Sequence, residues 1–126
     1  MGREVKHVTL NMMMTDGHSR ISVKAYTTKI AGVVVAPRHD YVIKGGEKRI
    51  VRRKQDWCIW TYPVGLRLLS GIPTKVQAVE FAEANLHKYQ WVALLKDDIL
   101  KNNDMDAMLK DFVDYRRQIV AMRNEP

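Results

Sequence analysis

The densest group of chemically active side chains in this sequence lies between residues 44 and 54, where six of eleven residues are basic. These are Lys44, Lys48, Arg49, Arg52, Arg53 and Lys54. Lysine and arginine neutralise phosphates and release counterions, and aromatic rings offer faces on which unpaired bases stack. Because Trp57, Trp60 and Tyr62 follow directly, we predict that the basic residues hold phosphates and that Trp60 or Tyr62 forms a stacking platform.

The same cluster also has a purely structural interpretation. Lysine and arginine guard the exposed edge of a sheet against aggregation, and tryptophan is usually mostly buried. If residues 49–53 form a strand, Arg49 and Arg53 share one face, and Arg52 lies on the other face with Ile50. Charge on both faces favours an exposed edge or a projecting hairpin. The sequence leaves the structural and the functional interpretation open.

The net charge of +7 lies entirely in the first half of the chain. Residues 1–63 hold 12 Lys and Arg against 5 Asp and Glu, which gives +7, whereas residues 64–126 hold 9 of each, which gives zero. A field concentrated on one part of a molecule attracts polyanions and speeds their encounter. We therefore expect a nucleic acid, DNA or RNA, as the partner, with an acidic protein as the alternative.

Signatures of catalysis and of metal binding are weak. The four histidines form no i,i+4 pair and no His-Glu-x-x-His motif, which argues against a zinc site. The acidic residues between 97 and 106 lack the spacing and the closing Glu of an EF-hand. Cys58, the only cysteine, lies between apolar residues and is typical of a small buried hydrophobe. We assign no catalytic residue, metal ligand or cofactor, and the sequence favours a non-enzymatic protein.

The elements that must position these residues form one domain with two halves. Residues 1–72 show the period of two and the β-branched runs of strands, and residues 73–126 show helical periodicity. Expected strands are 6–14, 21–26, 30–35, 41–44, 48–51 and 56–62, with turns at 15–19 and at Gly45-Gly46 and an end to the third strand at Pro37. We predict the α+β class: an antiparallel N-terminal sheet of about five to six strands packed by two to three C-terminal helices.

Capping residues mark the starts of the helices. Thr74-Lys75-Val76-Gln77 matches a capping box, in which the Thr74 hydroxyl accepts from the Gln77 backbone N–H. Residues 89–101 look helical too, and Asn103 or Asp104 can cap a last helix.

The last helix has the clearest periodicity in the chain. Its apolar seam consists of Met105, Met108, Phe112, Tyr115, Ile119 and Met122. A strict heptad seam suits a partner helix, but fewer than three heptads is short for a coiled coil. We expect this seam either to pack on the protein's own sheet or to join two copies in a homodimer.

The segment from Trp57 to Leu86 carries a partial resemblance. A Trp-led strand ends in the turn Pro63-Val64-Gly65, and Thr74-Lys75 opens an Ala-rich helix. This strand–turn–strand–helix unit resembles small uncharacterised phage or mobile-element accessory proteins. The resemblance implies an accessory protein of phage or bacterial origin and brings no assigned activity with it.

Together these patterns predict a non-enzymatic nucleic-acid-binding accessory protein that grips phosphates with a basic β-hairpin. The alternative is a protein-interaction module that inhibits or regulates a host protein, through the hairpin or the Met105–Met122 seam. No stretch approaches 18 uninterrupted apolar residues, and the N-terminus lacks an apolar signal core. We therefore expect a cytoplasmic protein without a membrane partner.

Overall fold

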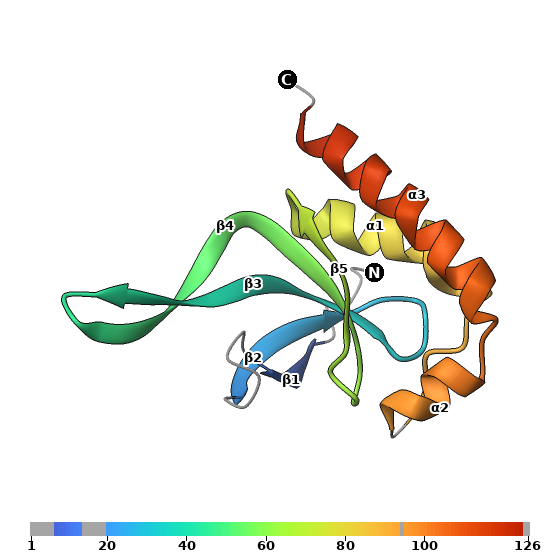
Figure 1. Ribbon diagram of the computed structural model, residues 1–126, viewed down its shortest axis with the longest axis horizontal. Helices are drawn as coiled ribbons and strands as arrows, with labels where there is room; N and C mark the ends of the chain where they lie inside the picture. The colour runs from blue at the N-terminus through green and yellow to red at the C-terminus, as the bar shows by residue number, and fades with distance from the viewer. Residues whose placement is uncertain (1–6, 14–19, 94, 125–126) are drawn as a thin grey trace, which may run out of the picture.

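The computed structural model describes residues 7–13, 20–93 and 95–124, which form one antiparallel sheet followed by helices (Figure 1). The strands are β1 (His7–Met13), β2 (Arg20–Thr27), β3 (Val33–Lys44), β4 (Glu47–Thr61) and β5 (Arg67–Ile72), paired in this order. The helices are α1 (Lys75–Asn85), the short 3-10 helix η1 (Leu86–Lys88), α2 (Lys96–Lys101) and α3 (Met105–Arg123). The predicted α+β class is confirmed. Residues 6 and 14 and the expected turn at 15–19 lie outside the described residues.

The third strand is longer than expected, because β3 continues through Pro37 to Lys44. The prediction that Pro37 ends this strand was wrong. A proline has no N–H for the ladder, so sheets tolerate it at bulges, and the β3–β4 register shifts between Pro37 and His39. The four short strands expected between residues 30 and 62 are therefore two long ones, which form a single hairpin.

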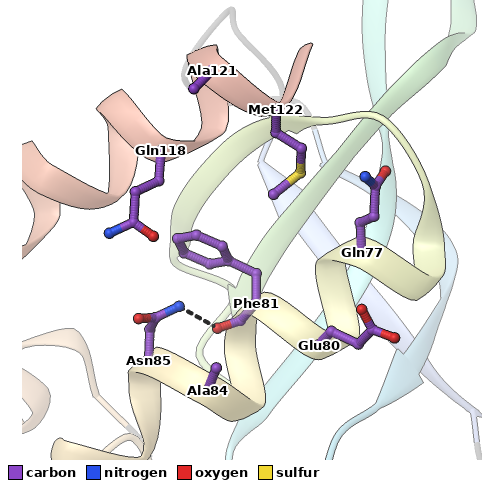
Figure 2. A pocket seen from close by; sticks show the side chains of 8 residues that line it. All are labelled: Gln77, Glu80, Phe81, Ala84, Asn85, Gln118, Ala121 and Met122. Atoms are coloured by element: carbon purple, nitrogen blue, oxygen red, sulfur yellow. Dashed lines mark hydrogen bonds between the residues drawn. The ribbon is translucent and has the colours of Figure 1, made fainter. Parts of the chain in front are cut away.

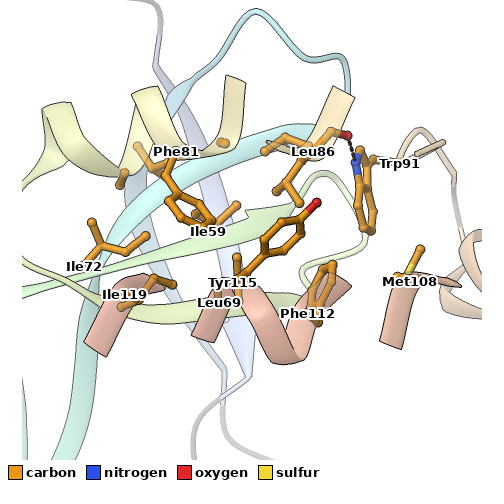
Figure 3. Close-up of a cluster of buried hydrophobic side chains, with 14 of the residues drawn as sticks. Ile59, Leu69, Ile72, Phe81, Leu86, Trp91, Met108, Phe112, Tyr115 and Ile119 are labelled. Atoms are coloured by element: carbon orange, nitrogen blue, oxygen red, sulfur yellow. Dashed lines mark hydrogen bonds between the residues drawn. The ribbon is translucent and has the colours of Figure 1, made fainter. Parts of the chain in front are cut away.

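The sheet buries apolar side chains on both faces. On one face Val35 and Ile59 pack with side chains of α1 and α3 (Figure 3). On the other face Cys58 and Trp60 pack with Leu10 and with other residues of β1 and β2. β1 and β2 can reach this second face because β2 pairs with β3 at only two positions and the sheet curls. The alternation predicted for residues 56–62 is confirmed by these two clusters.

Side-chain caps begin two of the helices. The Thr74 hydroxyl accepts from the Gln77 backbone N–H at 3.1 Å, as the capping box predicts. The Asp104 carboxylate accepts from the backbone N–H groups of Asp106 and Ala107 at 3.1 and 3.2 Å. Each cap satisfies donors that the first helical turn leaves without intrahelical partners.

The apolar seam of α3 packs into the protein's own core. Met108, Phe112, Tyr115 and Ile119 are buried, and Met105 and Met122 pack against the same cluster while partly exposed. Tyr115 lies close to Phe81 of α1 in Figure 3, and the two rings meet edge to face at 5.6 Å. Of the two uses expected for this seam, the structure shows packing on the protein's own sheet and α1.

The segment 89–101 is helical only from Lys96 to Lys101, so the prediction of a helix over its whole length was wrong. The Asn103 side chain accepts from the Gln90 backbone N–H at 2.8 Å and donates to the Gln90 carbonyl at 2.9 Å. Trp91 is buried, and its indole N–H donates to the Leu86 carbonyl at 2.8 Å. These tertiary contacts replace the backbone hydrogen bonds that a helix would supply.

Candidate functional site

The β3–β4 hairpin projects from the body of the protein as a two-stranded arm (Figure 1). We define the arm as residues 39–52. Its strands are in register from the pair His39–Arg52 to the pair Lys44–Glu47, and Gly45-Gly46 forms the turn. Both glycines have positive φ, at 61° and 80°, as a tight hairpin turn with right-handed strand twist requires. The predicted Gly-Gly hairpin is confirmed.

Cross-strand register divides the arm into two faces. Residues directly opposite one another in an antiparallel pair point to the same side of the sheet. One side, here called the Tyr41 face, carries His39, Tyr41, Ile43, Lys48, Ile50 and Arg52. The other side, here called the Asp40 face, carries Asp40, Val42, Lys44, Glu47, Arg49 and Val51. The sequence placed Arg49 and Arg52 on opposite faces, and the register confirms it.

Basic groups on the Asp40 face meet carboxylates. Arg53 donates to Asp40 at 2.9 Å, and Arg38 donates to the other oxygen of the same carboxylate at 3.2 Å. Burial pushes the pKa of Asp40 upward, but hydrogen bonds from Arg53 and Arg38 outweigh it, so the pKa lies below its ordinary value. Nearer the turn, Arg49 lies 3.5 Å from Glu47. The Asp40 face therefore carries two carboxylates, one paired with Arg38 and Arg53 beside the arm and one with Arg49 on the face itself.

The Tyr41 face combines cations with aromatic and apolar side chains. Its six positions include two cationic residues and no Asp or Glu. The Lys48 ammonium lies over the Tyr41 ring, 4.1 Å from its centroid. Ile43, near the turn, is 82% exposed. This face offers charge, a ring and apolar surface together.

An irregularity in β4 joins the arm to the body and sets its direction. Between the pairs Pro37–Trp57 and His39–Arg52, β3 contributes one residue and β4 contributes four. Gln55, within this bulge, has a φ of 55°, and its carbonyl accepts from Arg123 of α3 at 2.6 Å. The same guanidinium nitrogen donates to the Gly71 carbonyl at 2.8 Å, and Asp56 accepts from the Gly71 N–H at 2.8 Å. Bulges bend strands and redirect side chains, and these contacts fasten this one to α3 and β5.

The bulge brings Arg52 of the arm over Trp57 of the body, with the guanidinium 5.5 Å from the ring centroid. Trp57 in turn lies 6.1 Å from the Tyr26 ring, centroid to centroid. The Lys75 and Lys24 ammonium groups lie 3.9 and 5.7 Å from the centre of the Tyr26 ring. Rings and cations of three separate elements, β2, β4 and α1, therefore meet at the base of the arm.

These side chains border a groove of about 290 Å³, here called the arm-base groove, between β2 and the arm. It opens because β2 pairs with β3 only at Tyr26–Val35 and Thr27–Val34 and then diverges. Its lining includes Lys24, Tyr26, Pro37, His39, Arg52 and Trp57. The lining contains two cationic residues and no carboxylate, so its electrostatic character favours an anion. Because His39 and Arg52 also belong to the Tyr41 face, arm and groove form one continuous surface.

The structure brings together only part of the predicted site. Lys44, Lys48, Arg49 and Arg52 lie on the arm, whereas Arg53 and Lys54 lie in the bulge at its base, and Arg53 is held by Asp40. Trp60 is 5% exposed and packs in the second core cluster, so its prediction as a stacking platform was wrong. Tyr62 is half-buried, packs against that same cluster and follows the last residue of β4, at the end of the strand away from the arm.

The aromatic rings that do border the basic surface are Tyr26, Tyr41 and Trp57, each half-buried. Sequence reasoning did not select them. Tyr41 could have been found, because a ring on the hairpin directly beside the basic cluster has few apolar neighbours to bury it. Tyr26 and Trp57 meet only through tertiary structure.

A second groove lies between α1 and α3 and has a different character (Figure 2). It measures about 510 Å³, and Phe81 and Met122 provide apolar surface beside the side-chain amides of Gln77 and Gln118. Its lining holds one carboxylate, Glu80, and no Lys or Arg. This groove therefore does not suit a polyanion.

The only cysteine of the sequence is poorly placed for nucleophilic chemistry. Cys58 is fully buried, and burial, reinforced by Asp56, raises the pKa of its thiol to about 12. The prediction that Cys58 is a small buried hydrophobe is confirmed, since a thiol in this state is a poor nucleophile. Within residues 7–13, 20–93 and 95–124, His, Cys, Asp and Glu side chains nowhere gather in threes as a metal site requires.

Comparisons with known proteins return no match: no protein-family model, curated protein or solved structure matches the chain. Over the described part of the chain, no helix combines the length and the apolar character needed to cross a bilayer. The surface formed by the arm and the arm-base groove is the candidate site of this protein.

Proposed function

We propose that this is a non-enzymatic nucleic-acid-binding accessory protein that contacts its ligand with the Tyr41 face of the arm. The supporting observation is the continuous surface from Lys48 and Tyr41 through Arg52 into the arm-base groove. Basic side chains alternate with aromatic rings along this surface. The Tyr41 face itself has no Asp or Glu between them. Phosphates attract the cations, and bases can contact the rings.

The pairing of charge with aromatic surface favours a nucleic acid over an acidic protein. To bind an acidic patch on another protein, a surface needs only cations and no aromatic rings. The Asp40 face would then bind such a patch as well as the Tyr41 face. The three half-buried rings lie on or beside the Tyr41 face. A two-stranded β-ribbon also has the dimensions to follow a nucleic-acid groove or backbone.

Binding across a salt series tests this proposal. A fluorescent oligonucleotide should bind at low salt, and the affinity should fall with increasing salt at a log–log slope of about 0.7 to 0.9 per phosphate contact. With about four contacts, the expected slope lies near 3. An acidic peptide of equal charge serves as the competitor. Absence of oligonucleotide binding at low salt, or equal affinity for the peptide, would contradict the proposal.

A protein-interaction module remains the second candidate, because α3 exposes apolar side chains away from the core. Leu109, Val113 and Val120 are 57%, 47% and 58% exposed and lie on one flank of α3, beside its buried seam. A stable partner recovered from nuclease-treated extract, and lost on Leu109→Lys with Val113→Lys, would favour this function. Failure to recover any partner would count against this function, and recovery that survives these changes would exclude this face of α3 as the contact surface.

Origin and location belong to the same proposal. The resemblance of residues 57–86 to phage or mobile-element accessory proteins suits a small nucleic-acid-binding protein. We place it in the cytoplasm, where its ligand and a reducing environment for Cys58 are both present.

A further inference from the structure

We infer that the arm-base groove seats one unstacked base of a single-stranded nucleic acid and so gives the protein a preference for single strands. This inference rests on the proposed function, because the arm must first hold the phosphates beside the groove. It adds a ligand class and a specific subsite to that function.

The groove has the chemistry that an unpaired nucleotide requires. The Tyr26 and Trp57 rings supply surface for a base, and Lys24 and Arg52 lie beside those rings, where they can meet the adjoining phosphates. Lys75, whose ammonium lies 3.9 Å from the centre of the Tyr26 ring, adds a third cation beside that ring. The lining has no carboxylate that would repel a phosphate.

The size of the groove limits its occupant to a small unit. Ligand-binding clefts begin at about 300 Å³, and this one measures about 290 Å³, which suits one ring system with its attached sugar better than an extended ligand. Tyr26 and Trp57 are tilted by 52° and lie 6.1 Å apart, so a base would rest against the two rings rather than slide between them.

A groove between strands admits a base from a single strand much more readily than from a duplex. In a duplex each base is stacked on its neighbours, and taking one out costs unpairing and unstacking energy. A single strand avoids most of this cost, because its bases can be splayed out and stacked on protein rings. The arm alone, which offers phosphate contacts, would bind both forms.

The arm and the groove are spaced so that one strand can use both. From Pro37 at the groove to Ile43 near the turn, six residue steps of β3 extend roughly 20 Å at about 3.4 Å per residue. That length matches about six nucleotides of a stacked strand. A probe of about 12 nucleotides therefore covers the whole surface.

The first measurement is tryptophan emission during titration with oligothymidine of about 12 nucleotides and with a duplex of the same length. Trp60 and Trp91 are buried, so Trp57 is the tryptophan that a base can reach. Single strands should quench the emission of the wild-type protein, duplex should quench it much less, and Trp57→Phe should abolish the quenching. Equal quenching by both probes, or none by single strands that bind, would overturn the inference.

The second measurement uses a variant that fills the groove. Ser22 is an exposed residue of the lining, so Ser22→Phe should occupy the groove without disturbing the core. Because one base–ring contact has a stacking contribution of about 1–3 kcal/mol, single-strand affinity should fall about 5- to 150-fold. Duplex affinity should stay within about twofold, since phosphate contacts to the arm remain. Ala107→Phe, which adds the same ring to an exposed site on α3, is the control.

The two proposals fail in different ways. If wild-type protein binds neither probe, the proposed function is wrong. If it binds both with equal affinity, and Ser22→Phe changes neither, nucleic-acid binding stands and the groove inference is overturned.

Discussion

The assignment of the Tyr41 face predicts that two equal losses of charge on the arm have unequal effects. Lys48→Ala with Arg52→Ala removes two cations from the Tyr41 face. Lys44→Ala with Arg49→Ala removes two cations from the Asp40 face and is a matched control, because the net charge falls by the same amount. The long-range electrostatic attraction between the protein and a nucleic acid therefore weakens equally in both double variants. Only the direct contacts between the arm and the phosphates differ.

The size of the effect follows from counterion release. Each phosphate contact on a single strand contributes about 0.7 to the log–log salt slope, so losing two contacts should reduce the slope by about 1.4. If affinity at about 1 M salt is unchanged, affinity at about 0.1 M should fall by about 1.4 log units, or about 25-fold. The control pair should change affinity less than about threefold, because Arg49 already lies beside Glu47 and neither residue points to the groove side.

Fluorescence anisotropy with labelled single strands over about 0.05–0.5 M salt measures both quantities. Lys48 and Arg52 each stack over a ring, so the first pair should also lose roughly 1–2 kcal/mol of stability, at about 0.5–1 kcal/mol per exposed cation–π contact. Thermal melts must show both variants folded at the assay temperature. Equal losses in the two pairs would refute the assignment of the contact face, and an unchanged slope in both would refute binding by the arm.

Three further predictions concern the framework. Asp40→Asn leaves Arg53 without its carboxylate and should cost about 1.5–3 kcal/mol near neutral pH. Because folding lowers the pKa of Asp40 below its ordinary value of 3.8, the carboxylate contributes its full stabilisation above that value. The difference from wild type in urea melts should shrink below pH 3.8 and be lost only as the pH falls through the lower pKa of the folded state. Cys58 should resist iodoacetamide near pH 8 in the native protein and react after unfolding in urea, as mass spectrometry would show; rapid native labelling would contradict its burial. Gly32→Ala should destabilise more than Gly46→Ala, because both have φ near 80° but only at Gly32 would a Cβ lie 2.9 Å from backbone, that of Trp91. Similar melting temperatures for the two glycine variants would refute this contact.

Local pattern was sufficient to predict most of the sheet and the last helix. The period of two in β4 correctly separated Ile59 from Cys58, and the Gly45-Gly46 pair correctly marked the hairpin. Caps at Thr74 and Asp104 were visible because their bonds span only a few residues. Each of these features depends on neighbours in sequence.

The contact between Arg52 and Trp57 could not be predicted, because the alternation of side chains does not continue through a bulge. If side chains alternated regularly along β4, Arg52 and Trp60 would lie on the same side of the strand. Regular alternation therefore favours Trp60 as the ring beside the basic cluster. The bulge at residues 53–56 reverses this relation, so that Arg52 meets Trp57 instead. The bulge is fixed by Arg123, 68 residues further along the chain, and no local pattern reveals a bond over that separation.

The contact between Arg123 and Gln55 also explains how a charge-neutral helical half can matter to a basic arm. A two-stranded hairpin alone is marginally stable in water, and an arm that swung freely would lose entropy on binding. Burial of the α3 seam against the sheet places Arg123 where it can hold the bulge, and Asp56 ties the same segment to β5. The helices thus supply direction to the arm, while the strands supply its charge, its rings and the lining of the arm-base groove.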